Sequence, residues 1–390
     1  MFAAFKPRRQ FLKGLVAVAA AAVVSACEPV GIGGGPSVNT SKPIPVALLV
    51  PQSSQASGDS VLSQSLENAA RLAMADLGDV QIDLRVYDTA GDDAVAQAAA
   101  LRAVSEGAKI VLGPVRSGPS NAVGVALRGK NVNVLSFSNN TSIAGGNVFV
   151  LGPTFDNTAM RLAQFAARNG KSDVLTVHAN NVAGIAGRDA ISRALAFTSA
   201  SNAGAVSYEF SQQGVVASVQ DVRSAVRSTG ADAIFLTSDT SGALPLFTQL
   251  LPESGVNPAE VQYMGLTRWD IPAGTLELPG VQGGWFALPD PALTDQFRAR
   301  YAAAYGGTPH PIGGLAYDGI AAIGALVSQG KSDALTAAAL TQGAGFKGVN
   351  GIFRLRADGT NERGLAVATV RDKQVVIIDP APRSFGGAGF

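Results

Sequence analysis

Short apolar segments alternate along this chain with longer segments whose apolar residues recur every three or four positions. The first short segment, IPVALLV at 44–50, is rich in branched residues and predicts a buried strand. A helix pattern follows it and stops at Gly78. Further strands are predicted at 80–87, 109–112 and 132–137, and further helices at about 93–107 and 117–127. This order of units is typical of a doubly wound α/β lobe with a mostly parallel sheet.

The same alternation begins again after Leu151 and predicts a second α/β lobe of similar build. Strands are predicted at 174–178, 205–210, 233–237, 261–265 and 283–288, and helices at 157–170, 183–200, 219–228, 242–251, 294–305 and 314–329. The block from 351 to 378 predicts an antiparallel addition. We therefore assign 44–152 plus 290–346 to lobe 1, 153–289 plus 347–380 to lobe 2, and 381–390 to a loose tail.

Small polar residues follow the predicted strands and form the candidate ligand-binding set. In open parallel sheets, ligands bind outside the carboxyl ends of the strands, so side chains at those ends should meet at one rim. The start of the helix at 117 also offers unpaired backbone N–H groups, which suit a carboxylate. Serine and asparagine cap helices and form turns in many other places, and that alternative stays open. The candidates are Ser117, Ser138, Asn139, Asn140, Gln55 and Asn180.

Composition narrows the function further. The formal net charge is +1 and charged residues make up 15% of the chain, which argues against a nucleic-acid partner. A single cysteine and two histidines, His178 and His310, leave little material for a metal site, a cofactor or acid–base chemistry. The GxxxxGK pattern at 124–130 lacks the Ser or Thr of a phosphate-binding loop, and the SxxK pattern at 328–331 has no KTG after it. We predict no cofactor, no metal and no enzymatic activity.

Residues 1–27 predict an export signal, because a basic stretch precedes an apolar one too short to span a bilayer. Arg8 and Arg9 lie in a segment that resembles the twin-arginine export motif, with Pro7 where that motif usually has Ser or Thr. Val24 to Cys27 resembles a bacterial lipobox, which implies that Cys27 is acylated and anchors the protein to a membrane. Residues 28–43 then predict a flexible tether. The expected location is the periplasmic side of a bacterial membrane, with the outer membrane favoured.

Several segments resemble the type I periplasmic binding proteins, the leucine/isoleucine/valine-binding family, over nearly the whole mature chain. The matching segments are VALLVP at 46–51, VYDTAGD at 86–92, VLGP at 111–114 and GFKGVNGIFRLRADG at 345–359. The resemblance implies two lobes, three crossings of the chain between them, and a small amino-acid-like ligand in the cleft. It also implies that Ser117, Ser138 and Asn140 hold the carboxylate and amino group of that ligand. In the other lobe the chain departs from the family pattern at 182–184 and at 266–268.

The segment VLSFSNNTSIAGGNVFVLG at 134–152 looks like a segment of the penicillin-binding-protein activator lipoproteins, whose C-terminal domain has the same fold. This second resemblance implies a peptidoglycan synthase as partner. The favoured interpretation is that the protein is an activator of such a synthase. The helical-repeat region of the larger activators is missing before 44. The alternative is the substrate-binding lipoprotein of an amino-acid ABC transporter, for which the partner would be an ABC permease.

Overall fold

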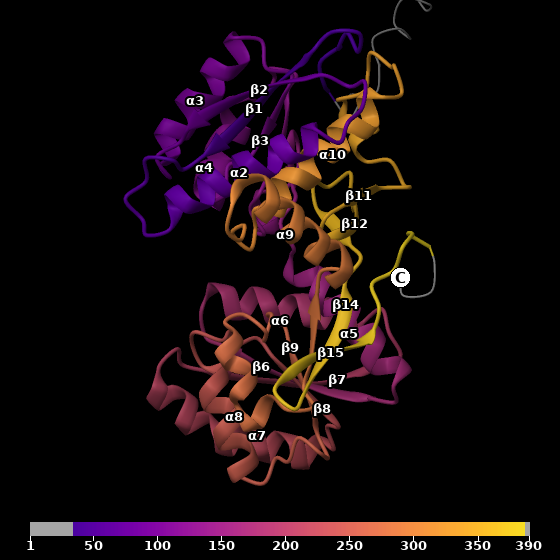
Figure 1. Ribbon diagram of the computed structural model, residues 1–390. Helices are drawn as coiled ribbons and strands as arrows, with labels where there is room; N and C mark the ends of the chain where they lie inside the picture. Colours follow the sequence, from indigo (N-terminus) through magenta and orange to yellow (C-terminus); the bar gives the residue numbers. More distant parts are fainter. Residues whose placement is uncertain (1–33, 387–390) are drawn as a thin grey trace, which may run out of the picture.

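Two α/β lobes, one above the other in Figure 1, make up the computed structural model, which describes residues 34–386. The sheet of lobe 1 has five parallel strands in the order β2-β1-β3-β4-β5. These strands are β1 (Ile44–Val50), β2 (Ile82–Asp88), β3 (Ile110–Leu112), β4 (Asn133–Ser136) and β5 (Val148–Val150). The helices between them are α2 (Asp59–Met74), α3 (Asp93–Ser105), α4 (Ser117–Ala126) and the short 3₁₀ turn η2 (Thr141–Ile143).

The apolar run of β1 is explained by burial on both faces of its sheet. Leu48 belongs to a core shared with α2 and α10 (Gly314–Val327), whereas Leu49 packs into a second core with α3 and α4. A strand covered by helices on both sides has no solvent-facing positions, so its sequence shows no alternation of apolar and polar residues.

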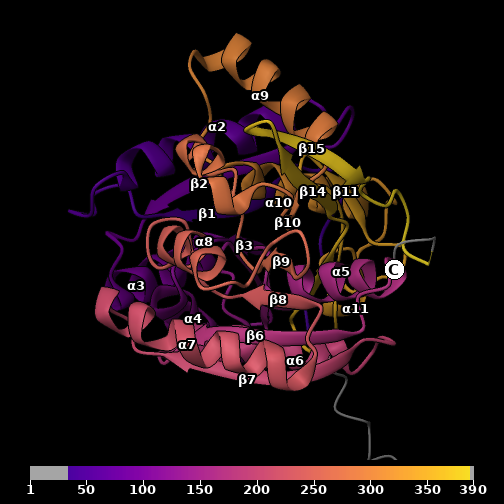
Figure 2. The ribbon, with the colours of Figure 1, turned by 90° about the horizontal axis from the view of Figure 1, so that it is seen from below.

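The sheet of lobe 2 has seven strands in the order β15-β14-β10-β9-β8-β6-β7, and Figure 2 shows it from below. Its parallel strands are β6 (Asp173–Ala179), β7 (Ser201–Tyr208), β8 (Ala233–Leu236), β9 (Gln262–Gly265) and β10 (Trp285–Leu288). Two antiparallel strands complete it, β14 (Ala366–Arg371) and β15 (Gln374–Asp379). The two-lobed fold with mostly parallel sheets, predicted from the sequence, is therefore confirmed.

Helices cover both faces of the second sheet. On one face lie α5 (Phe155–Arg168) and α6 (Val182–Leu195), and on the other lie α7 (Gln212–Thr229) and α8 (Leu244–Glu253). Two short 3₁₀ segments, η3 (Ala273–Glu277) and η4 (Pro279–Val281), precede β10.

The chain crosses between the lobes three times, from β5 into α5, from β10 into α9 (Pro291–Tyr305), and from β13 into β14. Phe297 of α9 lies in the core of lobe 1, as does Phe353 of a small antiparallel sheet. That sheet consists of β11 (Phe346–Gly348), β12 (Gly351–Leu355) and β13 (Asn361–Arg363), and the helix α11 (Ala337–Leu340) lies before it. The chain that returns from lobe 2 thus completes the core of lobe 1.

The packed part of lobe 1 begins before β1. Val38 is 5% exposed, belongs to the lobe 1 core, and donates its backbone N–H to Ser332 O at 2.8 Å. Within the predicted tether 28–43, residues near Val38 are therefore held by the fold. The predicted export signal and Cys27 lie outside the described residues. Within residues 34–386, no helix is both long and apolar enough to cross a membrane.

Candidate functional site

Each sheet contains one point at which the direction of strand addition reverses. In lobe 1, β1 lies between β2 and β3, and in lobe 2, β6 lies between β7 and β8. In lobe 1 the loops after β1 and β3 therefore turn to opposite faces of the sheet and leave a crevice between them. In lobe 2 the loops after β6 and β8 do the same. Ligands of open α/β sheets bind in this crevice, at the carboxyl ends of the strands.

The two crevices lie on the sides of the sheets that face the other lobe. The chain leaves lobe 1 directly after β5 and leaves lobe 2 directly after β10, so both crossings start at carboxyl ends. The other strands of each parallel set end on the same side as these two. We call these sides the carboxyl edges. They face each other across the space between the lobes in Figure 1.

The carboxyl edge of lobe 1 holds Ser117 at the first position of α4. No side chain caps this helix, and its N-cap residue is Arg116. The guanidinium of Arg116 pairs with the Asp59 carboxylate, with two nitrogen–oxygen distances of 2.8 Å. Burial acts to raise the pKa of Asp59, but hydrogen bonds from Arg116 and Ser54 outweigh it and lower the pKa below its usual value. A helix N-terminus and a held arginine therefore lie together at this edge.

The loop after β4 brings three of the predicted residues together. Ser138 is 5% exposed, and its hydroxyl accepts the backbone N–H of Asn140 at 3.1 Å. The Asn140 side chain accepts the N–H of Ser142 at 2.9 Å and caps η2, while Asn139 is exposed. This loop is tied to the turn before α4, because the N–H of Phe137 donates to Pro114 O at 2.9 Å. Ser138 and Asn140 thus have the turn-forming roles that were the alternative to ligand binding.

The remaining two predicted residues lie on opposite lobes. Gln55 is exposed in the loop after β1 and donates its amide to Ser53 O at 3.4 Å. Asn180, also exposed, follows β6 and donates its amide to Glu209 Oε1 at 2.9 Å. All six predicted residues lie at a carboxyl edge, and their binding roles stay predictions.

The carboxyl edge of lobe 2 contains polar groups that are not among the six predicted residues. Thr237 and Ser238 follow β8, and Trp269 lies four residues after β9. The hydroxyls of the first two and the indole N–H of Trp269 are buried without a hydrogen-bond partner. Thr237 and Ser238 lie at the end of the predicted strand 233–237, so the rule that selects Ser138 and Asn180 would also select them. Beside them, Arg268 and Asp270 form an ion pair.

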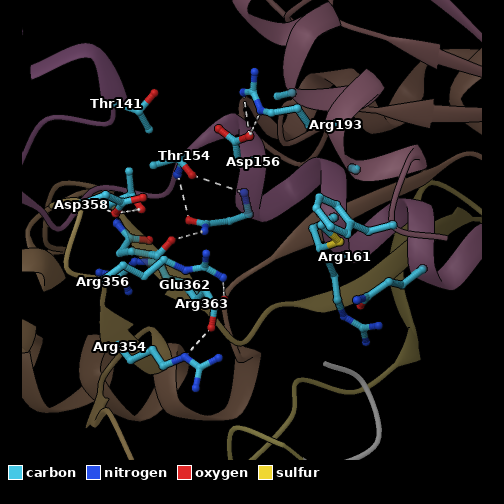
Figure 3. A pocket seen from close by; sticks show the side chains of 18 of the residues that line it. Thr141, Thr154, Asp156, Arg161, Arg193, Arg354, Arg356, Asp358, Glu362 and Arg363 are labelled. Atoms are coloured by element: carbon cyan, nitrogen blue, oxygen red, sulfur yellow. Dashed lines mark hydrogen bonds and ion pairs between the residues drawn. The ribbon is translucent and has the colours of Figure 1, made fainter. Parts of the chain in front are cut away.

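A cavity of about 910 Å³ lies beside the segments at which the chain crosses between the lobes, which we call the hinge, rather than at the carboxyl edges (Figure 3). Its walls come from α5 and α6 of lobe 2 and from the segment 354–363 around β13. The guanidinium of Arg193 pairs with Asp156 at 2.7 Å, and Glu362 pairs with both Arg354 and Arg356. Glu362 is thus shared by two arginines, and the lining contains five arginines and three carboxylates.

Nothing at either edge resembles a metal centre. Within residues 34–386 there is no group of three or more His, Cys, Asp or Glu side chains placed to hold a metal ion. His178, at the end of β6, is 5% exposed and its ring Nδ1 lies 3.0 Å from Ala179 O. The contact is local and places this ring in the packing at the edge.

Comparison with known proteins gives a family match and many structural matches. A family model described as periplasmic binding protein matches residues 43–374. No curated protein matches the chain. A branched-chain amino acid ABC transporter periplasmic ligand-binding protein from Burkholderia xenovorans LB400 has a TM-score of 0.68 at 18% identity, and the match covers 86% of this chain and 96% of that one.

Two further solved structures contain a bound small molecule. An ABC transporter substrate-binding protein from Desulfitobacterium hafniense, in complex with leucine, matches with a TM-score of 0.63 at 16% identity, covering 86% of this chain and 100% of that one. A solute-binding protein of an ABC transporter from R. palustris, in complex with benzoate, matches with a TM-score of 0.57 at 17% identity, covering 89% and 99%. At these identities the matches establish the fold.

Proposed function

The chain belongs to the periplasmic binding protein family, and from this premise we propose that it is a substrate-binding protein of an ABC transporter. In this proposal the protein holds a small carboxylate between the two carboxyl edges and delivers it to a permease. The family implies export to the periplasm, and its members are typically non-enzymatic solute-binding proteins. The preference for a penicillin-binding-protein activator, drawn from 134–152, is not supported by the comparisons, which favour the transport alternative.

The observation that carries the proposal is the uncapped start of α4 at the carboxyl edge of lobe 1. A helix N-terminus without a capping side chain leaves N–H donors for an anion. Ser117 adds a hydroxyl, and the guanidinium of the neighbouring Arg116, held by the Asp59 carboxylate, adds further N–H donors. Leucine and benzoate, the ligands of two structural matches, differ in size and shape but both carry a carboxylate. That shared group is the one the edge of lobe 1 suits.

A thermal-shift screen with matched ligand pairs tests the proposal. Leucine is compared with leucinamide and benzoate with benzamide, so that each pair differs only in the anionic group. A carboxylate at a hundred times its Kd adds about 2.7 kcal/mol to the free energy of unfolding, and its amide should add far less. The proposal fails if no small carboxylate in a broad panel raises the melting temperature, or if the amides act equally well.

A double variant, Ser117→Ala with Arg116→Gln, locates the effect. Removing a hydroxyl and a nearby cation should weaken carboxylate binding about tenfold or more, because hydrogen bonds to charged groups contribute about 1.5–3 kcal/mol each. Ser105→Ala, at the end of α3, is the matched control and should leave the affinity unchanged. Equal affinities for the double variant and the wild type would place the ligand elsewhere.

We further propose that Cys27, which lies outside the described residues, is acylated and anchors the protein to the membrane. The test is the membrane fraction of cells that express the protein. Wild type should remain with the membranes after a high-salt wash, and Cys27→Ser should not. Release of both proteins by the same wash would exclude lipid anchoring.

A further inference from the structure

Three buried side-chain atoms without a hydrogen-bond partner belong to residues that follow β8 and β9 of lobe 2. They are Thr237 Oγ1, Ser238 Oγ and Trp269 Nε1, and they make up three of the seven such side-chain atoms in residues 34–386. Ser238 is 4% exposed and Trp269 is wholly buried. A buried donor or acceptor without a partner destabilises a fold, so the adjacent hydroxyls of Thr237 and Ser238 need a physical reason. Binding of a ligand between the lobes supplies one.

The position of these atoms fits that reason. Thr237 and Ser238 continue β8, which pairs with β6 at the crevice of lobe 2. A Cβ on Gly187 of α6 would lie 3.1 Å from the Thr237 methyl group, so this side chain is packed against the helix that starts at the crevice. The hydroxyl of Thr267 donates to Ser238 O at 3.3 Å and ties the loops after β8 and β9 together. Thr237 and Ser238, which we call the polar cluster, are therefore held in place at the edge that faces lobe 1. Trp269 packs beside Phe286 in the core on the other face of the sheet.

The charged groups around the cluster are already engaged. Arg268 and Asp270 pair with each other, and Glu209 accepts the Asn180 amide at 2.9 Å. Asp239 accepts the N–H and the hydroxyl of Ser241 at 3.1 and 3.0 Å. Burial, together with the Asp239 carboxylate, raises the pKa of Tyr208 to about 12, which places Asp239 on the side of the outer strand β7. The cluster itself contributes only neutral donors and acceptors.

We infer that the ligand is a carboxylate whose second polar group is uncharged, such as a 2-hydroxy acid, and that Thr237 and Ser238 bind that second group. This inference rests on the proposed function. A hydroxyl of the ligand can both donate to and accept from the two side-chain hydroxyls. A buried ammonium needs a paired anion to offset its loss of hydration, and the cluster has none to give. The carboxylate of the ligand then lies against lobe 1, and its neutral polar group against lobe 2.

Calorimetric titration with matched acids tests the inference. Each pair shares a side chain and differs only at the second carbon: leucine and 2-hydroxy-4-methylpentanoate, phenylalanine and 3-phenyllactate, and glutamate and 2-hydroxyglutarate. In the pair that binds best, the hydroxy acid should bind at least about tenfold more tightly than the amino acid, a difference of about 1.4 kcal/mol. A tighter amino acid in that pair overturns the inference while leaving the carboxylate proposal intact. Binding of none of the six, with a flat screen of other carboxylates, overturns both.

Ser238→Ala gives a second and independent test. Because the wild-type hydroxyl has no partner, its removal should leave the stability of the unliganded protein unchanged or raised, while hydroxy-acid affinity falls about tenfold. Ser218→Ala is the matched control, since Ser218 is equally buried but donates its hydroxyl to Val215 O at 2.8 Å in α7. That control should lose stability and keep its affinity. A Ser238→Ala protein that loses stability and binds hydroxy acids as well as wild type does would show a purely structural role.

A third variant, Asp239→Asn, distinguishes a hydroxy-acid ligand from an amino-acid ligand. Asp239 is the carboxylate closest in sequence to the cluster, and Asp239→Asn keeps its shape but removes its charge. If the second polar group of the ligand is uncharged, this variant should bind the hydroxy acid within about twofold of wild type. A tenfold or larger loss, confined to amino acids that bind the wild type, would make Asp239 the ammonium partner and overturn the inference.

Discussion

The hinge and the carboxyl edge of lobe 2 differ in whether their most buried polar side chains have hydrogen-bond partners. At the hinge, Asp318 of α10 is wholly buried, yet it accepts hydrogen bonds from Val349 N–H, the Asn350 amide and the Arg363 guanidinium at 2.8–3.1 Å. Arg363 in turn donates to Leu151 O at 3.0 Å in the first crossing. At the edge of lobe 2, Ser238 and Trp269 are equally buried and have no partner. Both regions are buried and polar, but the Arg363–Asp318 pair of the hinge needs no ligand, and the buried side-chain atom of β13 without a partner is Asn361 Oδ1.

This difference indicates what each region is for. The pair Arg363–Asp318 has side chains only 2% and 0% exposed and links β13, α10 and the crossing near Leu151. It fixes the third crossing and the first crossing to the body of lobe 1. Lobe motion would therefore turn about the segments on the lobe 2 side of this pair, whereas the edge of lobe 2 has buried hydroxyls without a partner.

The largest effect is expected for Asp318→Ala. This change leaves the Arg363 guanidinium buried without its anion, and breaking such a pair costs about 3–5 kcal/mol of stability. Urea unfolding followed by far-ultraviolet circular dichroism measures the loss. Glu67→Ala is the control, because the exposed pair of Glu67 with Arg71 contributes at most about 1 kcal/mol. Similar losses for the two variants would contradict the view that the hinge depends on Asp318.

A smaller loss is expected for Asn361→Ala. The Asn361 amide donates to Val150 O at 2.7 Å and to Gly152 O at 2.9 Å, and both belong to the first crossing. Two buried carbonyls would lose their donor, so the free energy of unfolding should fall by about 1–3 kcal/mol. Asn180→Ala, which removes an exposed amide at the edge of lobe 2, should stay within about 0.5 kcal/mol of wild type. Equal losses of stability for Asn361→Ala and Asn180→Ala would contradict the view that burial makes the hinge amide more important for stability.

The sequence predicts the parts of the fold that have apolar periodicity. The predicted strand 44–50 is β1, because a strand buried on both faces must be apolar throughout. The edge strand β7 was predicted at 205–210 but spans Ser201–Tyr208, because its first residues are polar and exposed. The strand β13 was not predicted, because its three residues are polar and serve the hinge through Asn361 and Arg363.

The candidate site is a similar case. Strand ends led to Ser117 and Asn180, since the carboxyl ends of parallel strands can be located from the sequence alone. They could not show that the hydroxyl of Ser138 and the amide of Asn140 are engaged in a turn, because this depends on where the backbone N–H groups point. Ser238 directly follows a predicted strand, so its position could be found in the same way. Its lack of a partner is a property of the folded protein and leaves no mark in the sequence.

The smallest effect is expected at the edge of lobe 1, where Asp59 pairs with Arg116. Burial acts to raise the pKa of Asp59, and the hydrogen bonds from Arg116 and Ser54 lower it to below the value of about 3.8 expected in the unfolded chain. The stabilisation from this carboxylate is therefore present above the unfolded pKa and is lost as the pH falls through the lower folded pKa. Because the Arg116 side chain is 43% exposed, the pair should contribute no more than about 1 kcal/mol.

Asp59→Asn removes this titration and keeps the size of the side chain. Between about pH 5 and pH 3, wild type should therefore lose more stability than Asp59→Asn, by at most about 1 kcal/mol, in urea unfolding at each pH. A double-mutant cycle with Arg116→Gln at pH 7 should give a coupling energy of the same size. Parallel pH profiles with no coupling would mean that the pair does not act as a unit. Arg116 could then turn toward a bound carboxylate without loss of stability. The edge of lobe 1 would then resemble that of lobe 2 in having polar groups available to a ligand.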